Sequence, residues 1–177
     1  VELLPIHAAF SEAFLLKRGR TNYWGYSTLS YFAPEPSYAT AASQAAGPQA
    51  VLDELRGMIS LLHKAGLEVI MDVVYNHTCE SGVDGPSLSL RGLGNLEYYL
   101  HSPHRPAQYF DVTGTGNTVD FRSTRAVQLA LDSLRYWAGE VGIDGFRFDL
   151  AVTLGRNASE FHARHPLLVG MATDPVL

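Results

Sequence analysis

The stretch Ile143-Asp-Gly-Phe-Arg-Phe-Asp-Leu-Ala151 places a cation and an anion, Arg147 and Asp149, within an otherwise apolar strand pattern. Strand side chains alternate between two faces, so these two charges are predicted to point the same way. The apolar residues that alternate with them are predicted to face an apolar layer: Phe146, Phe148 and Leu150. Buried charges are costly unless they pair or take part in chemistry. A polar run follows, from Thr153 to Asn157, and indicates the mouth of a pocket.

Two helix patterns and one further strand pattern precede this stretch. Residues 124–141 are predicted helical, with one apolar side. Residues 67–74 form a nearly continuous apolar run, typical of a strand covered on both faces. Residues 48–65 are predicted to form another helix, because Pro48 suits the first helical position and Gly66 suits its end.

The order of elements is therefore strand, helix, strand, helix, strand, since residues 1–6 also fit the end of a buried strand. Right-handed crossovers between such strands imply a parallel sheet and the α/β class. An open doubly wound sheet and a closed (β/α)8 barrel both fit this pattern. Residues 7–44 are predicted to form a long loop, and residues 78–122 a functional loop or small subdomain. The start in mid-strand leads us to expect an internal piece of a larger protein.

The composition indicates a globular domain without a nucleic-acid or membrane partner. The chain has 177 residues, a formal net charge of −5 and 46% hydrophobic residues, which predicts a globular domain rather than a disordered chain. The acidic balance argues against a nucleic-acid partner. No apolar run reaches the roughly 18 residues that a membrane helix needs, so no membrane partner is expected. The single cysteine, Cys79, excludes a disulfide within the chain.

A second group of polar residues lies at the end of the middle strand, in Asp72-Val-Val-Tyr-Asn-His77. Functional groups of parallel α/β folds lie at the carboxyl ends of strands, so Asp72, Asn76 and His77 are expected to meet Arg147 and Asp149 there. Each has a structural interpretation too, as an ion pair, a helix cap or a loop histidine. Their coincidence at adjacent strand ends favours a functional site, in which an Asp beside an Arg stays ionised.

The segment Asn22-Tyr-Trp-Gly-Tyr26 is a cluster of aromatic residues in a polar region. Exposed aromatic faces suit the apolar faces of sugar rings, whereas a small satellite core beneath a loop is the structural alternative. The sequence has no phosphate-binding glycine loop, no Cys/His metal spacing and no serine nucleophile elbow.

Together these motifs resemble the α-amylase superfamily of glycoside hydrolases, family 13. DVVYNH at 72–77 resembles the first signature of that family, and GFRFDLA at 145–151 resembles the second. The resemblance is closest to bacterial glycogen debranching enzymes and isoamylases. Three further segments match that branch: ELLPIHAAF at 2–10, NYWGYST at 22–28 and TGTGNTVD at 113–120.

The resemblance implies a (β/α)8 barrel, of which residues 1–177 would form part of the catalytic domain, about strands 2 to 4. The long segment at about 78–122 would be the extended loop after the third strand. It implies that Asp149 is the catalytic nucleophile, that Arg147 keeps it ionised and oriented, and that Asp72 organises the site.

The resemblance also implies substrate-binding residues. His77 matches a histidine that binds the sugar in the reactive subsite, and Asn76 precedes it in the same signature. Tyr26 matches a tyrosine that stacks on that sugar, with Trp24 close by.

The implied reaction is retaining hydrolysis, which needs a second carboxylic acid as acid and base. Glu160, expected in a loop or helix, does not fit that part, so the chain alone is expected to be inactive. The implied function is hydrolysis of α-1,6 branch linkages in glycogen or limit dextrins. Alternatives are another α-glucan hydrolase or transglycosidase acting on α-1,4 linkages, and a non-catalytic glucan-binding relative.

The same resemblance sets expectations for cofactor and compartment. Residues 7–20 lack the acidic cluster that holds calcium in some isoamylases, so no metal or other cofactor is expected. Because bacterial glycogen is cytoplasmic, a cytoplasmic location is implied.

Overall fold

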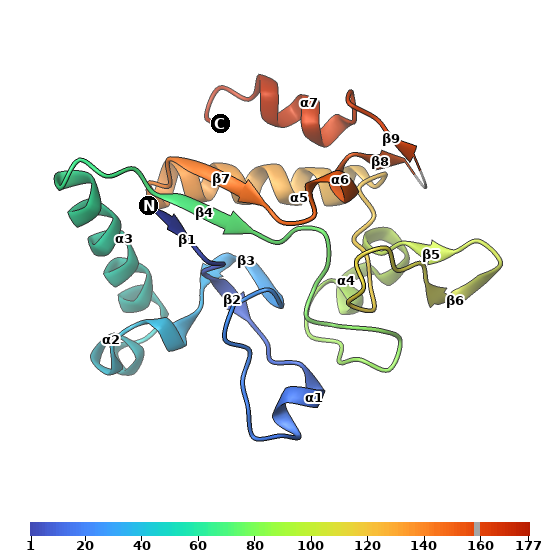
Figure 1. Ribbon diagram of the computed structural model, residues 1–177, viewed down its shortest axis with the longest axis horizontal. Coiled ribbons are helices and arrows are strands. Elements are labelled where there is room, and N and C mark those ends of the chain that lie inside the picture. Colours follow the sequence, from blue (N-terminus) through green and yellow to red (C-terminus); the bar gives the residue numbers. More distant parts are fainter. Residues whose placement is uncertain (158–159) are drawn as a thin grey trace.

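A three-stranded parallel sheet lies at the centre of the chain. The computed structural model describes residues 1–157 and 160–177. The sheet has the order β1 (Glu2–Leu3), β4 (Ile70–Val73) and β7 (Gly145–Phe148), with both pairings parallel. Figure 1 shows these strands side by side with the helices packed around them. The predicted α/β class with a parallel sheet is confirmed.

Two helices connect the strands, as the sequence predicts. The helix α3 (Pro48–Lys64) has its proline in the first turn and a basic last turn. The helix α5 (Thr124–Arg135) begins after Ser123, whose side chain accepts hydrogen bonds from two first-turn amides. It continues into the π-helical turn η2 (Tyr136–Val141), and Gly142, at φ 93°, turns the chain toward β7.

The core lies between the sheet and these helices. Met71 and Val73 of β4 are fully buried, as are Leu134 and Trp137 of the helical layer. Each large apolar side chain contributes roughly 1.5–3 kcal/mol when buried. This packing fixes the position of β4 and therefore of the polar residues that follow it.

Residues 7–44 are more regular than predicted. They contain the antiparallel pair β2 (His7–Ala9) and β3 (Thr28–Pro34) and the short helices α1 (Ala13–Leu16) and η1 (Pro36–Tyr38), and the helix α2 (Ala41–Ala46) begins within them. The expectation of a long loop was wrong because two register shifts break the alternation of β2 with β3. Figure 1 shows α1 and its flanking loops extending away from the sheet.

The segment of residues 78–122 contains the helix α4 (Leu90–Tyr98) and the hairpin of β5 (His101–Ser102) with β6 (Arg105–Tyr109). Its interior holds the buried carboxylate of Glu80, which accepts hydrogen bonds from the amides of Leu88, Ser89 and Arg91 at 2.7–2.8 Å and from the Tyr99 hydroxyl. Burial opposes ionisation of Glu80, but these hydrogen bonds outweigh it and lower its pKa.

The chain after β7 differs from expectation at two residues. Leu150 was predicted to face an apolar layer but is 42% exposed, because its left-handed conformation, at φ 43°, turns it outward. Glu160 was expected in a loop or helix and lies in a strand instead. The remaining elements are α6 (Ala151–Leu154), the antiparallel pair of β8 (Arg156–Asn157) and β9 (Glu160–Phe161), and α7 (Pro166–Thr173). In the described part of the chain, no helix is both long and apolar enough to cross a membrane.

Candidate active site

The ends of β4 and β7 bring two charged residues into direct register. Asp72 pairs with Arg147 across the two strands, and Arg147 Nη1 lies 3.0 and 2.9 Å from the two carboxylate oxygens of Asp72. The Asp72 side chain is 3% exposed and that of Arg147 is 45% exposed. A buried carboxylate is thus paired with a cation that reaches the surface.

Asp149 lies one residue beyond β7, at the mouth of this arrangement. Its amide donates to the carbonyl of Val73 at 3.0 Å, which continues the pairing of the strands past Phe148. Its Oδ1 lies 3.3 Å from Arg147 Nη1, as expected for two side chains on one face of a strand. The following residue, Leu150, then turns the chain away, so the carboxylate stays at the strand end.

Asn76 reaches the same carboxylate from the neighbouring strand end. Its side chain is completely buried, and Nδ2 donates to the main-chain carbonyl of Asp149 at 2.9 Å and to Oδ2 of Asp149 at 3.0 Å. The carbonyl of Asn76 accepts from the Val119 amide at 2.9 Å, which fixes the backbone at this point. The two oxygens of Asp149 are thus held by different donors.

His77 is buried between Asn76 and the aromatic segment. Its Nδ1 contacts Asn76 Oδ1, and its Nε2 lies 2.9 Å from the carbonyl oxygen of Tyr26. The ring satisfies both contacts only when doubly protonated, but burial acts against that charge and lowers the pKa of His77, although the Tyr26 carbonyl opposes this. In this arrangement the ring supports the loop of Tyr26.

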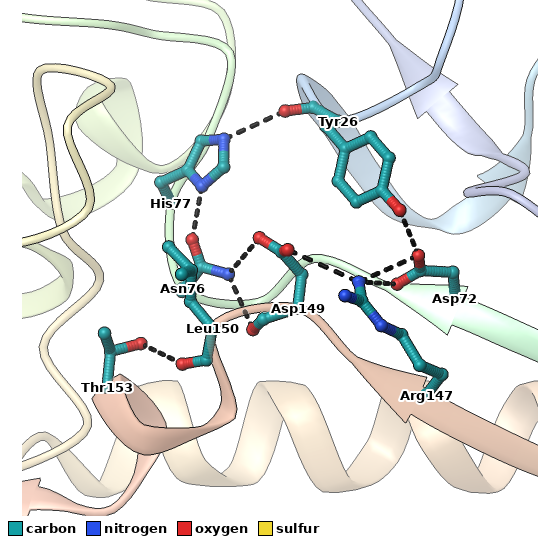
Figure 2. Close-up of polar contacts among 8 residues, drawn as sticks. All are labelled: Tyr26, Asp72, Asn76, His77, Arg147, Asp149, Leu150 and Thr153. Carbon is teal, nitrogen blue, oxygen red and sulfur yellow. Dashed lines mark hydrogen bonds and ion pairs between the residues drawn. The ribbon is translucent and has the colours of Figure 1, made fainter.

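Tyr26 closes a ring of contacts around the site. Its hydroxyl donates to Oδ2 of Asp72, and burial, followed by this hydrogen bond, raises the pKa of Tyr26 to about 12. Figure 2 shows the resulting circuit, in which each residue contacts the next: Tyr26, Asp72, Arg147, Asp149, Asn76, His77 and again Tyr26. The sequence predicted that the strand-end residues would meet, and the structure brings them together.

An open cleft of about 700 Å³ lies in front of this circuit, with Arg147 and Asp149 in its wall. Trp24 and Tyr23 also line it and are 64% and 83% exposed, so they do not form the satellite core that was the structural alternative. The rings of Trp24 and Tyr26 are 6.4 Å apart and inclined by 66°. The cleft therefore combines a carboxylate with exposed aromatic surface.

The aromatic segment is held in place by residues that sequence reasoning did not select. Asn22 Nδ2 donates to both carboxylate oxygens of Glu12 at 3.0 Å, and Asn22 Oδ1 accepts from the Gly25 amide at 2.7 Å. Gly25 has φ +81°, and a Cβ there would lie 2.5 Å from the carbonyl oxygen of Pro5. The spacing of Asn22 and Gly25 within the motif was visible in the sequence, whereas nothing marked Glu12 as their partner.

The chemistry that this arrangement supports is nucleophilic or electrostatic. A carboxylate between a guanidinium and an amide is held in one orientation, as a nucleophile requires. In the part of the chain that the structure describes, no group of three or more His, Cys, Asp or Glu side chains could hold a metal ion.

Comparison with known proteins identifies relatives over the whole chain. No protein-family model matches it. The glycogen operon protein GlgX homologs of Mycobacterium bovis and Mycobacterium tuberculosis are each 44% identical over all 177 residues. The chain spans only 24% of the length of these relatives.

Solved structures show the same fold. The pullulanase of Paenibacillus barengoltzii, in complex with maltohexaose and alpha-cyclodextrin, superposes with a TM-score of 0.73 at 33% identity, over 88% of this chain and 23% of that one. The type I pullulanase of Bacillus subtilis, complexed with maltose, gives a TM-score of 0.70 at 33% identity, over 87% of this chain and 20% of that one.

Identity over the full chain and a shared fold agree with the two signature motifs at the strand ends. The chain belongs to the α-amylase superfamily of glycoside hydrolases, family 13. Its relatives there are the GlgX homologs and the pullulanases.

Proposed function

We propose that the protein carrying this chain hydrolyses α-1,6 branch linkages in glycogen or its limit dextrins. The observation that carries the proposal is the Asp149 carboxylate, held between Arg147 and Asn76 in the wall of an aromatic-lined cleft. Because the chain covers about a quarter of its relatives, this activity is proposed for the full-length protein.

The proposed mechanism is a double displacement. Asp149 attacks the anomeric carbon, the bond to the leaving oxygen breaks, and a second carboxylic acid protonates that oxygen. The same acid, now a base, takes a proton from water, which releases the sugar from Asp149. Arg147 orients Asp149 and places a positive charge beside it, and Asp72 in turn holds the guanidinium in place.

Sugar binding is assigned to the aromatic side of the cleft. Tyr26 and Trp24 present inclined rings near the Asp149 carboxylate, where the apolar face of a glucose unit would lie. His77 and Asn76 are proposed to complete the reactive subsite. Both ring nitrogens of His77 already contact protein oxygens, so its contribution in this arrangement comes through Tyr26 and Asn76.

We further propose that the parallel sheet is part of a (β/α)8 barrel, about strands 2 to 4, and that residues 78–122 form the subdomain after the third strand. In support, β1 and β7 each pair on one side only among the described residues, and strand edges of this kind are closed in a barrel.

The second carboxylic acid is proposed to be a Glu at the end of the next barrel strand. Glu160 is exposed and lies in the antiparallel pair of β8 and β9, which is separate from the parallel sheet, so it does not supply that group. The chain by itself is therefore proposed to be inactive. No metal is proposed for the reaction, and a branched α-glucan in the cytoplasm is the proposed substrate.

Product analysis of the full-length protein tests this function. Incubation with branched glycogen is expected to release short linear α-1,4 chains, with little action on linear maltooligosaccharides, and chelation with EDTA is expected to leave the rate unchanged. Cleavage or transfer confined to linear maltooligosaccharides would instead support the α-1,4 alternative. Binding of glycogen without any new reducing ends would support a non-catalytic relative.

A further inference from the structure

We propose that Asn76 is a positioning residue that fixes the orientation of the Asp149 carboxylate. Through its contact with His77, Asn76 also links that orientation to the position of the aromatic loop that carries Tyr26. The inference rests on the function proposed above, in which Asp149 attacks the sugar. It assigns Asn76 a part in the chemistry that differs from contact with the substrate, because its side chain is completely buried.

The orientation of the Asn76 amide follows from its neighbours. The main-chain carbonyl and the carboxylate of Asp149 can only accept hydrogen bonds, so the group that faces them must be the NH₂ of Asn76. The amide oxygen of Asn76 then faces His77 and accepts from Nδ1. One side chain therefore binds Asp149 with one end and His77 with the other.

Asn76 and Arg147 hold Asp149 differently. Arg147 Nη1 lies 3.3 Å from Oδ1 and is shared with Asp72, at 2.9 and 3.0 Å. Asn76 Nδ2 lies 3.0 Å from Oδ2 of Asp149 and also donates to the main-chain carbonyl of Asp149 at 2.9 Å. Because a single donor binds the main chain and the side chain of Asp149, it restricts rotation of the carboxylate. Arg147 thus places a positive charge beside the carboxylate, and Asn76 fixes the orientation of the carboxylate.

The backbone of Asn76 is fixed independently of its side chain. Its carbonyl accepts from the Val119 amide at 2.9 Å. A substitution at Asn76 is thus expected to change the contacts of the side chain while the strand end stays in place.

The link to the aromatic loop runs through the His77 ring. Nδ1 contacts Asn76, and Nε2 lies 2.9 Å from the carbonyl oxygen of Tyr26 (Figure 2). Tyr26 also contacts Asp72, the partner of Arg147. The nucleophile and the residue proposed to stack on the sugar therefore belong to one closed set of contacts.

Asn76→Asp in the full-length protein tests the role, because it keeps the shape and replaces the donor with a second carboxylate. Adjacent carboxylates share a proton more readily, so the acidic limb of the pH profile of kcat/KM is expected to move to higher pH by about one unit. Because the Asp149 carboxylate is then held in a less favourable orientation for attack, kcat on branched glycogen is expected to fall roughly 10²-fold. KM is expected to change much less, since the cleft-lining residues are untouched.

Asn117→Asp is the matched control. Asn117 is a completely buried amide that accepts from the Thr78 amide and donates to the carbonyls of Thr78 and Ser81, each at 3.0 Å, outside the cleft. Its substitution is expected to lower Tm but to leave the acidic limb in place. Asn76→Ser, which is neutral and too short to reach Asp149, is the second variant if Asn76→Asp does not fold, and is expected to lower kcat roughly tenfold or more.

The outcomes separate the two proposals. Suppose that the wild type is active and that a folded Asn76→Asp or Asn76→Ser variant keeps the wild-type kcat and acidic limb. This result overturns the role of Asn76 and leaves the proposed function standing. A wild type that cleaves neither branched nor linear α-glucan overturns the proposed function, and the role of Asn76 with it.

Discussion

Asp72 and Arg147 are direct register partners on adjacent parallel strands, and the guanidinium of Arg147 binds both oxygens of a carboxylate that is 3% exposed. The two members of the pair differ in exposure, since 45% of the Arg147 side chain reaches solvent. The pair therefore responds asymmetrically to the loss of either member, because water can solvate the arginine but not the aspartate.

Arg147→Met is expected to destabilise the full-length protein by about 2 kcal/mol, since it leaves the buried Asp72 without its cation. Asp72→Asn is expected to cost less, because Arg147 can turn toward water. Urea unfolding at pH 7 measures both, and the double variant is expected to be more stable than Arg147→Met alone. A double variant that is less stable than either single variant would contradict this account of the pair.

Asp149→Asn is expected to abolish turnover while leaving the fold intact. The amide is isosteric with the carboxylate but cannot attack the anomeric carbon, so release of reducing ends from branched glycogen is expected to fall at least ~10³-fold. Circular dichroism and Tm serve as the control for folding. Near-normal debranching by a folded variant is the result that rules out Asp149 as the nucleophile.

Gly25→Ala is expected to disrupt the aromatic loop. A Cβ at Gly25 would lie 2.5 Å from the Pro5 carbonyl oxygen, so the loop carrying Trp24 and Tyr26 must shift. A loss of about 1.4 kcal/mol in substrate binding would raise KM about tenfold.

Gly19→Ala is the matched control for this loop. Gly19 also has a positive φ, +65°, but a Cβ there meets nothing within 4 Å. The substitution is expected to cost about 1–2 kcal/mol of stability through the left-handed backbone alone and to leave KM unchanged. Equal KM values for the two variants would show that contact with Pro5 does not position the aromatic loop.

His7 is expected to make stability depend on pH. It is fully buried against Tyr31, Tyr75 and Trp137, neither ring nitrogen has a hydrogen-bond partner among the described residues, and burial lowers its pKa to about 3. Below about pH 6.5 the unfolded state takes up a proton that the folded state does not, so stability falls as the pH drops from 6.5 toward 3.

His7→Phe removes the proton uptake by the unfolded state at this position. The variant is therefore expected to lose less stability between pH 7 and pH 4 than the wild type, and the difference is up to about 1.4 kcal/mol per pH unit. Urea midpoints across that range provide the measurement, with His104→Phe, in the exposed turn of the β5–β6 hairpin, as the control. Parallel pH profiles for wild type and His7→Phe would exclude His7 as the source.

The positions of the strand ends could be predicted because the local pattern of apolar and polar residues identifies each strand. The apolar run around Asp72 and the alternation around Arg147 identify two strands, and a parallel sheet brings their carboxyl ends together. Asn76 was expected at the end of the middle strand. In the structure β4 ends at Val73, and the Asn76 amide reaches Asp149 from an irregular segment beyond it. A sequence pattern does not encode such a contact, because it depends on the path of the chain after the strand.

The remaining differences arise from contacts between distant segments and from single backbone torsions. The β2–β3 pair is held across an irregular register that breaks the alternation on which strand prediction relies. The aromatic segment depends on Glu12 and on the approach of Gly25 to Pro5, neither of which has a local signature. Leu150 was misplaced because one left-handed residue reverses the face that alternation assigns.

The buried carboxylate of Glu80 makes the segment up to Arg91 a candidate unit for grafting. Glu80 gathers the amides of Leu88, Ser89 and Arg91, and the Arg91 guanidinium binds the carbonyls of Glu80, Gly82 and Gly85 in return. The fold of this segment is thus fixed largely by its own two ends. A chimera that exchanges residues 81–90 with those of a relative is expected to keep the scaffold of the site if Glu80 and Arg91 are retained together.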